Sequence, residues 1–112
     1  MENCLFCRIA NGEIPSAKVY EDDAVLAFRD IAPAAPEHVL IIPKKHYDNV
    51  MQLDDDLMLA RMFAAAREVA KQLGISETGF RLVINTGKDS GQTVEHLHMH
   101  MLGARELGWP PG

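Results

Sequence analysis

Short apolar runs, bounded by polar, glycine or proline residues, recur along the chain and predict β-strands. These runs cover residues 18–21, 24–29, 38–42 and 80–85. Asp22-Asp23 separates the first two, and because such a pair is typical of a tight turn, the two runs predict a hairpin. The third run is apolar and rich in β-branched residues, as in a central strand, and Pro43 ends it.

One long stretch has apolar residues at helical spacing instead. They are Leu59, Met62, Phe63, Ala66, Val69, Ala70 and Leu73. Asp54 to Asp56 precede them, and an acidic first turn suits the positive end of a helix dipole. Gly74 stands where helices commonly end. A second, shorter helix is predicted over residues 4–11, stopped by Asn11-Gly12.

Strict alternation of period two occurs near the C-terminus, in His96-Leu97-His98-Met99-His100-Met101-Leu102. This pattern predicts a half-buried strand over residues 96–102, ended by Gly103. The strand would carry three imidazoles on one face and apolar side chains on the other. A polar, glycine-rich loop over residues 86–92 leads into it.

The order of elements predicts an α+β domain spanning residues 1–112. Its sheet would be mostly antiparallel, with about five strands, one long helix and a short N-terminal helix. The tail over residues 103–112 shows no regular pattern and holds the only tryptophan, Trp109. A tryptophan on a loose tail buries nothing by itself, so we expect it to pack on a surface, such as that of a partner.

Composition and charge argue against a nucleic-acid binder and against a membrane-spanning protein. The 112 residues carry a net charge of −5 with histidine neutral, and they form no basic stripe, which argues against a nucleic-acid binder. No apolar run approaches the roughly 18 residues of a membrane span. The residues Met1-Glu2-Asn3 provide neither the basic start nor the apolar run of a signal peptide, so a cytoplasmic location is expected.

A row of imidazoles has three interpretations. Polar residues facing water are the simplest, but strict alternation beside a glycine-rich loop disfavours this one. A metal site is the second, because His-x-His on a strand can present two ligands to zinc. Nucleophilic catalysis at phosphorus is the third, and the glycine-rich loop favours it, because backbone N–H groups of such loops hold phosphate oxygens.

The histidine stretch fits the His-φ-His-φ-His-φ-φ signature (φ apolar) of the histidine triad family. The chain also resembles the nucleotide-binding, purine phosphoramidase branch of that family along most of its length. The matching residues are Phe28-Arg29-Asp30-Ile31, Pro33, Ala35-Pro36, His38-Val39-Leu40-Ile41-Ile42-Pro43-Lys44-Lys45-His46, Asn85, Gly91-Gln92 and Gly108-Trp109-Pro110-Pro111-Gly112. Glu95 departs from the pattern, since many relatives have tyrosine there.

This resemblance implies a homodimer that hydrolyses adenosine or guanosine phosphoramidates to the nucleoside monophosphate and an amine, without a catalytic metal. By its match, His98 would be the nucleophile, His100 and His38 would lie near the phosphate, and Thr93 would face the leaving group. The remaining matches imply nucleotide contacts: Phe6, Ile9, Phe28, Ile31 and Leu40 for the base, Asp30 for the ribose hydroxyls, and Asn85, Gly91 and Gln92 for the phosphate and leaving group. Packing in the core explains Phe6, Phe28 and Leu40 equally well.

Cys4 and Cys7 form a Cys-x-x-Cys pair that, with His46 and His96, has the number and type of ligands of a structural zinc site. Some bacterial relatives resemble this arrangement. Two reduced thiols without a metal are the alternative. Two other functions also remain open: a nucleotide-binding regulatory or scaffold protein with vestigial hydrolysis, and a dinucleoside polyphosphate hydrolase or nucleotidyl transferase.

Overall fold

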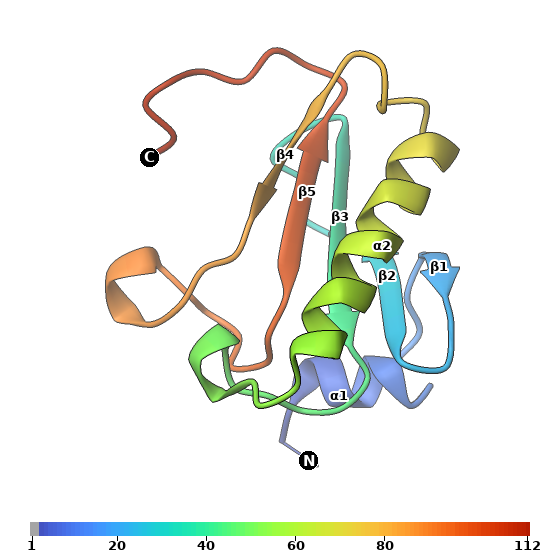
Figure 1. The fold of residues 1–112 in the computed structure, drawn as a ribbon, viewed down its shortest axis with the longest axis vertical. Coiled ribbons are helices and arrows are strands. Elements are labelled where there is room, and N and C mark those ends of the chain that lie inside the picture. Colours follow the sequence, from blue (N-terminus) through green and yellow to red (C-terminus); the bar gives the residue numbers. More distant parts are fainter. Residues whose placement is uncertain (1–2) are drawn as a thin grey trace.

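Five antiparallel strands form the sheet of the protein in the order β1-β2-β3-β5-β4 (Figure 1). They are β1 (Lys18–Glu21), β2 (Val25–Arg29), β3 (Glu37–Pro43), β4 (Phe80–Val83) and β5 (Met99–Gly103). This computed structural model describes residues 3–112, so Met1 and Glu2, on which the signal-peptide expectation is based, lie outside the described residues. The predicted hairpin and the central position of β3 are confirmed.

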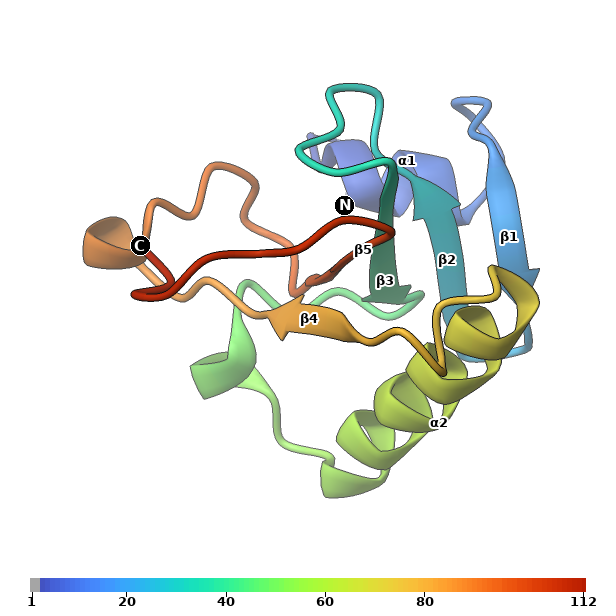
Figure 2. The same ribbon diagram turned by 90° about the horizontal axis from the view of Figure 1, so that it is seen from above.

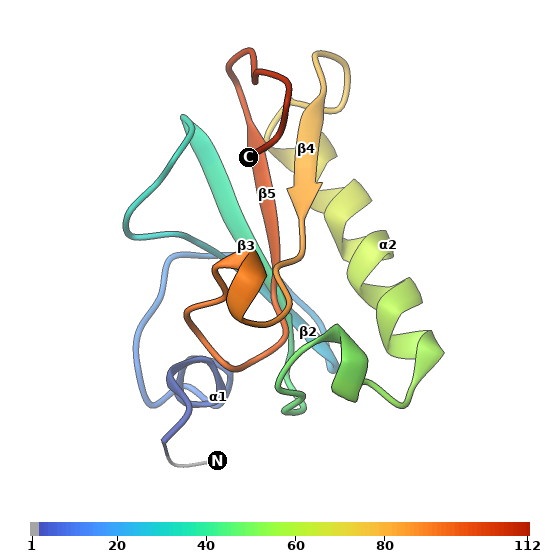
Figure 3. The same cartoon turned by 90° about the vertical axis from the view of Figure 1, so that its left-hand side faces the viewer.

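Two helices cover opposite faces of the sheet. The long helix α2 (Asp56–Gln72) packs across one face, and the short helix α1 (Leu5–Ala10) lies on the other (Figures 2 and 3). Asp55 begins α2 by accepting a hydrogen bond from the backbone N–H of Leu57 at 3.0 Å. The predicted α+β architecture, with one long helix and a short N-terminal helix, is confirmed.

The sheet therefore separates two cores. The α2-side core is the larger and includes Val39, Ile41, Met62 and Val69. The α1-side core consists of Cys4, Phe6, Ile9, Leu26, Phe28, Leu40 and Ile42. Strand periodicity assigns side chains to one core or the other, since neighbouring residues point to opposite faces.

The histidine stretch shows this alternation of faces. Leu97, Met99 and Met101 are fully buried in the α2-side core. The three histidines point to the opposite face, where β3 pairs Leu40 with His100. The predicted face assignment is therefore confirmed.

The predicted strand over residues 96–102 is wrong at its start, because β5 begins only at Met99. The pairing Ile41↔Met99 would place Leu97 opposite Pro43 in a continued ladder. Proline has no N–H to donate, so the ladder stops there. The backbone N–H of Leu97 donates instead to the carbonyl of Tyr47 at 2.7 Å.

Smaller differences occur elsewhere. The strand predicted to reach Asn85 ends at Val83, where its pairing with His100 of β5 ends. Between β3 and α2 lies the 3₁₀ helix η1 (Val50–Gln52), capped by the Asn49 side chain. A further 3₁₀ helix, η2 (Lys88–Ser90), occupies the middle of the predicted glycine-rich loop.

Among residues 3–112, no helix has both the length and the apolar character needed to cross a membrane.

Candidate active site and metal cluster

A cavity of about 660 Å³ opens on the α1 side of the sheet. It brings together nine of the predicted site residues: Phe6, Ile9, Phe28, Asp30, Ile31, Leu40, Thr93, His98 and His100. The predicted contacts His38, Asn85, Gly91 and Gln92 do not line it. His38 lies directly behind His100, with its Nε2 atom 2.9 Å from His100 Nδ1.

The cavity wall is apolar and partly aromatic. Phe28 and Leu40 are cross-strand partners on β2 and β3, and Phe6 of α1 faces Phe28 edge-on, with ring centroids 5.5 Å apart. Phe6 also meets His98 edge-on at 5.1 Å. All of Phe6, Phe28 and Leu40 are buried in the α1-side core as well, so core packing and pocket lining coincide in these residues. Such a slot suits a flat aromatic ligand.

Asp30 and Ile31 line this cavity and come directly after β2 in the chain. One carboxylate oxygen of Asp30 accepts a hydrogen bond from the backbone N–H of Ala32 at 2.8 Å. The other lies 3.4 Å from His38 Nε2. Ile31 is fully exposed, which leaves its side chain free to contact a ligand.

The tautomer of His98 follows from its hydrogen bond to the backbone. Its Nδ1 atom lies 2.7 Å from the carbonyl oxygen of His96. Because a carbonyl only accepts, Nδ1 carries the proton in the neutral ring, and Nε2 keeps its lone pair. His98 thus has an unprotonated nitrogen available for attack on a ligand in the cavity.

His100 has the opposite tautomer, set by a chain of hydrogen bonds. The backbone N–H of Ala34 donates to His38 Nδ1 at 2.9 Å, so His38 carries its proton on Nε2. That proton is donated to Nδ1 of His100. His100 therefore carries its own proton on Nε2, where it can donate to a ligand. Two histidines that line the cavity consequently offer different groups, a lone pair and an N–H.

Burial keeps His38 and His100 neutral. Desolvation lowers the pKa of His100 to about 4, with His98 and His38 adding to the effect. Desolvation also lowers the pKa of His38, and the Asp30 carboxylate opposes this shift. The tautomers assigned to His38 and His100 require neutral rings, which these shifts provide at neutral pH.

Gln92 holds the glycine-rich loop against the segment after β3. Its side-chain amide donates to the carbonyls of Asp48 at 2.8 Å and Val94 at 2.9 Å, and accepts from the backbone N–H of Gly87 at 2.9 Å. These contacts place the next residue, Thr93, in the cavity wall. The phosphate contacts expected for Gly91, Gln92 and Asn85 stay predictions.

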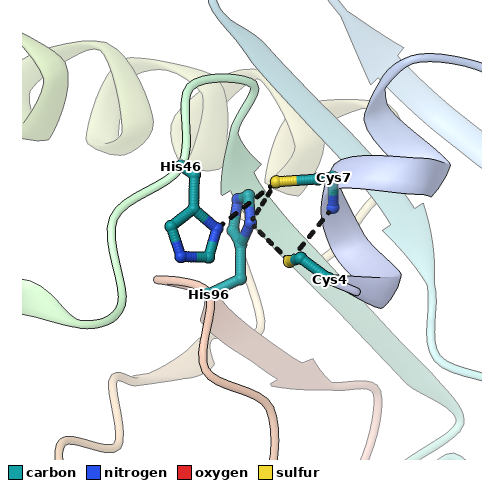
Figure 4. Close-up of side chains that lie close together, drawn as sticks. All are labelled: Cys4, Cys7, His46 and His96. Atoms are coloured by element: carbon teal, nitrogen blue, oxygen red, sulfur yellow. Dashed lines mark hydrogen bonds between the residues drawn. The ribbon is translucent and has the colours of Figure 1, made fainter. Parts of the chain in front are cut away.

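Cys4, Cys7, His46 and His96 converge beside this cavity (Figure 4). Their ligand atoms all lie within 4.8 Å of one another. The Nδ1 atom of His96 is 3.2 Å from Cys4 Sγ and 3.4 Å from Cys7 Sγ, and His46 Nδ1 is 3.3 Å from Cys7 Sγ. A tetrahedral zinc site has S···N edges of about 3.6 Å, so these three S···N distances are slightly shorter than those of a zinc site.

Both histidines of this cluster are oriented for metal binding. Nε2 of His96 lies 2.8 Å from the carbonyl oxygen of Pro43, and Nε2 of His46 lies 2.7 Å from Asp48 Oδ1. These acceptors hold the proton on Nε2 and leave the Nδ1 lone pair toward the thiols, an arrangement usual for histidine ligands of metals. The donor set fits zinc. The ion would be held by Cys4, Cys7, His46 and His96, and it would cross-link the segments that carry them.

In a second group, Asp30, His38 and His100, the possible ligand atoms also lie within 4.8 Å of one another. Here both nitrogens of His38 are used in hydrogen bonds, to Ala34 and to His100. His38 therefore has no lone pair to offer an ion, and the group is explained by its hydrogen bonds.

Some lining residues were missed from the sequence. The connector after α1 contributes Ile14 and Pro15, and Val94 follows Thr93 in the wall. No periodicity marks these positions as a pocket surface. Asp48 was missed as the partner of His46, although a carboxylate two residues from a predicted histidine ligand was an available signal.

Comparison with known proteins agrees with this geometry. Residues 11–107 match the HIT domain. The chain belongs to the HIT family. It is 48% identical over 109 residues to the purine nucleoside phosphoramidase of Escherichia coli, covering 96% of this chain and 92% of that protein.

Solved structures of HIT proteins superpose closely. A HIT family hydrolase from Legionella pneumophila has 52% identity and a TM-score of 0.95, covering 98% of this chain and 100% of that one. A histidine triad protein from Clostridium difficile has 49% identity and a TM-score of 0.93, covering 96% of both chains. The family assignment and the HIT fold expected from the histidine signature are thus confirmed, and these relatives support hydrolase activity.

Because His100 stays neutral to a lower pH in the folded protein than in the unfolded chain, the free energy of unfolding should depend on pH. Its pKa is about 4 when folded and about 6.5 in an unfolded chain. The unfolded chain binds the proton first, so the free energy of unfolding should fall as pH is lowered from about 6.5 to about 4. We expect a loss of about 1–2 kcal/mol after allowing for solvent screening. Urea unfolding of the wild type and His100→Gln measures it. A variant with an unchanged pH slope would contradict the assignment.

Proposed function

We propose that the protein hydrolyses purine nucleoside phosphoramidates through a nucleotidyl-histidine intermediate. The observation that carries this proposal is the pair of opposite tautomers at one end of an aromatic-lined cavity, the His98 Nε2 lone pair and the His100 Nε2–H. Similarity to the E. coli protein named purine nucleoside phosphoramidase supports the substrate class.

The chemistry proceeds in two displacements at the α-phosphorus. In the first, His98 Nε2 forms a bond to phosphorus, the P–N bond breaks, and the amine leaves with the bonding electrons after taking up a proton. Thr93 and His100 supply donor groups in the cavity wall for the leaving group and the phosphate oxygens. In the second, water attacks phosphorus, loses a proton, and releases the nucleoside monophosphate from His98. No step requires a metal.

The apolar wall would receive the purine between Phe6, Ile9 and Leu40, and the Asp30 carboxylate would accept from the ribose hydroxyls. This role is supported by the place of Asp30 in the cavity wall, where its carboxylate is partly exposed. His38 acts behind His100, since it donates the hydrogen bond that sets the His100 tautomer.

Removal of the nucleophile tests the mechanism. His98→Gly should lower turnover of an adenosine phosphoramidate by more than about a thousandfold. The variant should still bind AMP, because the base slot and Asp30 are unchanged. Rapid-quench measurement should show a burst of amine in the wild type and none in the variant.

Turnover that survives in His98→Gly would overturn this mechanism. AMP binding with negligible turnover of every phosphoramidate by the wild type would favour the regulatory or scaffold alternative. Faster cleavage of diadenosine polyphosphate than of phosphoramidate would favour the hydrolase or transferase alternative.

We also propose that Cys4, Cys7, His46 and His96 bind a structural zinc ion. Both cysteines are free thiols in the structure, and zinc thiolates persist in a reducing compartment, which agrees with the cytoplasmic location we propose. The orientation of both imidazoles by Pro43 and Asp48 supports binding through Nδ1.

Protein purified without chelator should contain about one zinc per chain by elemental analysis. Asp48→Asn should weaken zinc binding about 10- to 100-fold, because the partner that orients His46 loses its charge. Zinc far below one per chain, lost on simple dialysis, would contradict a structural site.

We further propose a homodimer formed at the β4 edge of the sheet. β4 is an edge strand, and its residue Phe80 exposes 37% of its surface. On α2, Phe63 and Leu57 expose 43% and 74%. The tail after β5 extends past the β4 edge, held by a hydrogen bond from Arg81 to the carbonyl of Gly108, and Trp109 is 82% exposed (Figure 1). A partner subunit would cover these residues.

Sedimentation velocity at micromolar concentration should give twice the 12.4 kDa mass of one chain. Phe80→Lys should shift the distribution toward the single-chain species, because a charge would be placed in an apolar interface. A wild-type protein that sediments only as the 12.4 kDa species would exclude this dimer.

A further inference from the structure

Residues 96–98, which carry the nucleophile, are not held by the sheet. The ladder between β3 and β5 begins at Ile41↔Met99, one residue after His98. The backbone N–H of Leu97 donates to the carbonyl of Tyr47, and the Leu97 side chain is buried in the α2-side core. The side chain of His96 contacts Pro43 and both cysteines. The position of His98 therefore depends in part on how firmly His96 is held.

His96 also controls the orientation of the neighbouring nucleophile directly. Its carbonyl oxygen is the acceptor for His98 Nδ1–H at 2.7 Å. A shift or rotation of the His96 peptide would remove the acceptor that keeps the lone pair on His98 Nε2. His96 therefore connects the two sites. Its side chain belongs to the Cys/His cluster, and its backbone carbonyl sets which nitrogen of His98 is reactive.

Helix α1 makes a second connection between the same two places. It has only six residues, too few to be stable alone, so its position depends on tertiary contacts. Cys4 caps the helix and Cys7 lies within it, while Phe6 and Ile9 of the same helix line the cavity. The Phe6 ring stands edge-on to both His96 and His98, at 6.0 and 5.1 Å.

We infer that metal occupancy of the cluster and nucleotide binding in the cavity are thermodynamically coupled through His96 and α1, with His96 as a positioning residue for His98. A metal that fastens Cys4 and Cys7 to His46 and His96 holds the base-slot wall and the nucleophile in their binding arrangement. Nucleotide then binds at lower entropic cost, and bound nucleotide in turn holds the ligands in place.

This inference rests on the proposed function, since AMP serves as the probe of the cavity, and on zinc as the ion in the cluster. Calorimetry should show AMP binding about 5- to 10-fold more weakly to chelator-stripped protein than to zinc-loaded protein. Because coupling is reciprocal, saturating AMP should raise zinc affinity by the same factor in a competition titration. Circular dichroism checks that the stripped protein remains folded.

Imidazole ¹⁵N spectra at fixed neutral pH provide a readout independent of affinity. Zinc-loaded protein should show His98 as a single Nδ1–H tautomer. Stripped protein should show a mixture, because the His96 carbonyl is no longer held in place. A role of the metal limited to overall stability would raise the unfolding temperature without changing the AMP affinity or the tautomer.

Asp48→Asn offers a test that keeps every ligand and cavity residue. The Asp48 side chain is half-exposed and bonds His46 Nε2, so its substitution weakens zinc binding and leaves the fold intact. At limiting zinc the variant should bind AMP about 5- to 10-fold more weakly than wild type, and excess zinc should restore the affinity. Asp54→Asn, an exposed aspartate at the start of α2, is the matched control and should show no zinc dependence beyond that of the wild type.

Equal AMP affinity, within twofold, for loaded and stripped protein would overturn the coupling while leaving the proposed function intact. Absence of AMP binding to zinc-loaded protein would refute both. Failure of zinc to bind would refute the coupling and the metal site, while AMP binding and phosphoramidate turnover would still support the proposed function. Unfolding of the stripped protein would overturn the inference, because metal and nucleotide would then be coupled through global folding and not through His96 and α1.

Discussion

The hydrogen bond from His98 Nδ1 to the carbonyl oxygen of His96 is the interaction on which the site depends. This hydrogen bond keeps the proton of the neutral ring on Nδ1. The lone pair therefore stays on Nε2, the nitrogen available to a ligand in the cavity. The backbone can provide this acceptor because residues 96–98 are outside the β-ladder, where carbonyl groups would pair with a neighbouring strand. Pro43, which cannot donate, is the reason why the ladder ends there.

A sheet covered on both faces makes this arrangement possible. Met99 and Met101 anchor β5 in the α2-side core, while the histidines of the same segment face the α1-side core and the cavity. Desolvation on that face keeps His100 and His38 neutral, so three imidazoles can lie close together without repulsion between charges. Burial on the α2 side of the sheet thus stabilises the fold, and burial on the α1 side keeps His38 and His100 neutral.

Much of the architecture was predictable because it depends on local periodicity. The hairpin, the central strand and the long helix follow from apolar spacing and from turn residues such as Asp22-Asp23. The nine cavity residues were found through the resemblance to a family rather than through their own pattern, since Ile9 or Leu40 alone is no different from any core residue. Ile14, Pro15 and Val94 have no such pattern and were missed.

The sequence by itself determined the elements, the faces on which their side chains lie, and the residue types available for chemistry, because period-two and period-3.6 spacing are properties of a single chain. Only the tertiary structure decided where β5 begins, which nitrogen of each histidine holds its proton, and that Asp48 is the partner of His46. Cys4 and His96 are 92 residues apart in the chain, but Cys4 Sγ and His96 Nδ1 are 3.2 Å apart in the fold. Hydrogen-bond partners so distant in sequence follow from the packing of β3, β5 and α1, and no local pattern specifies them.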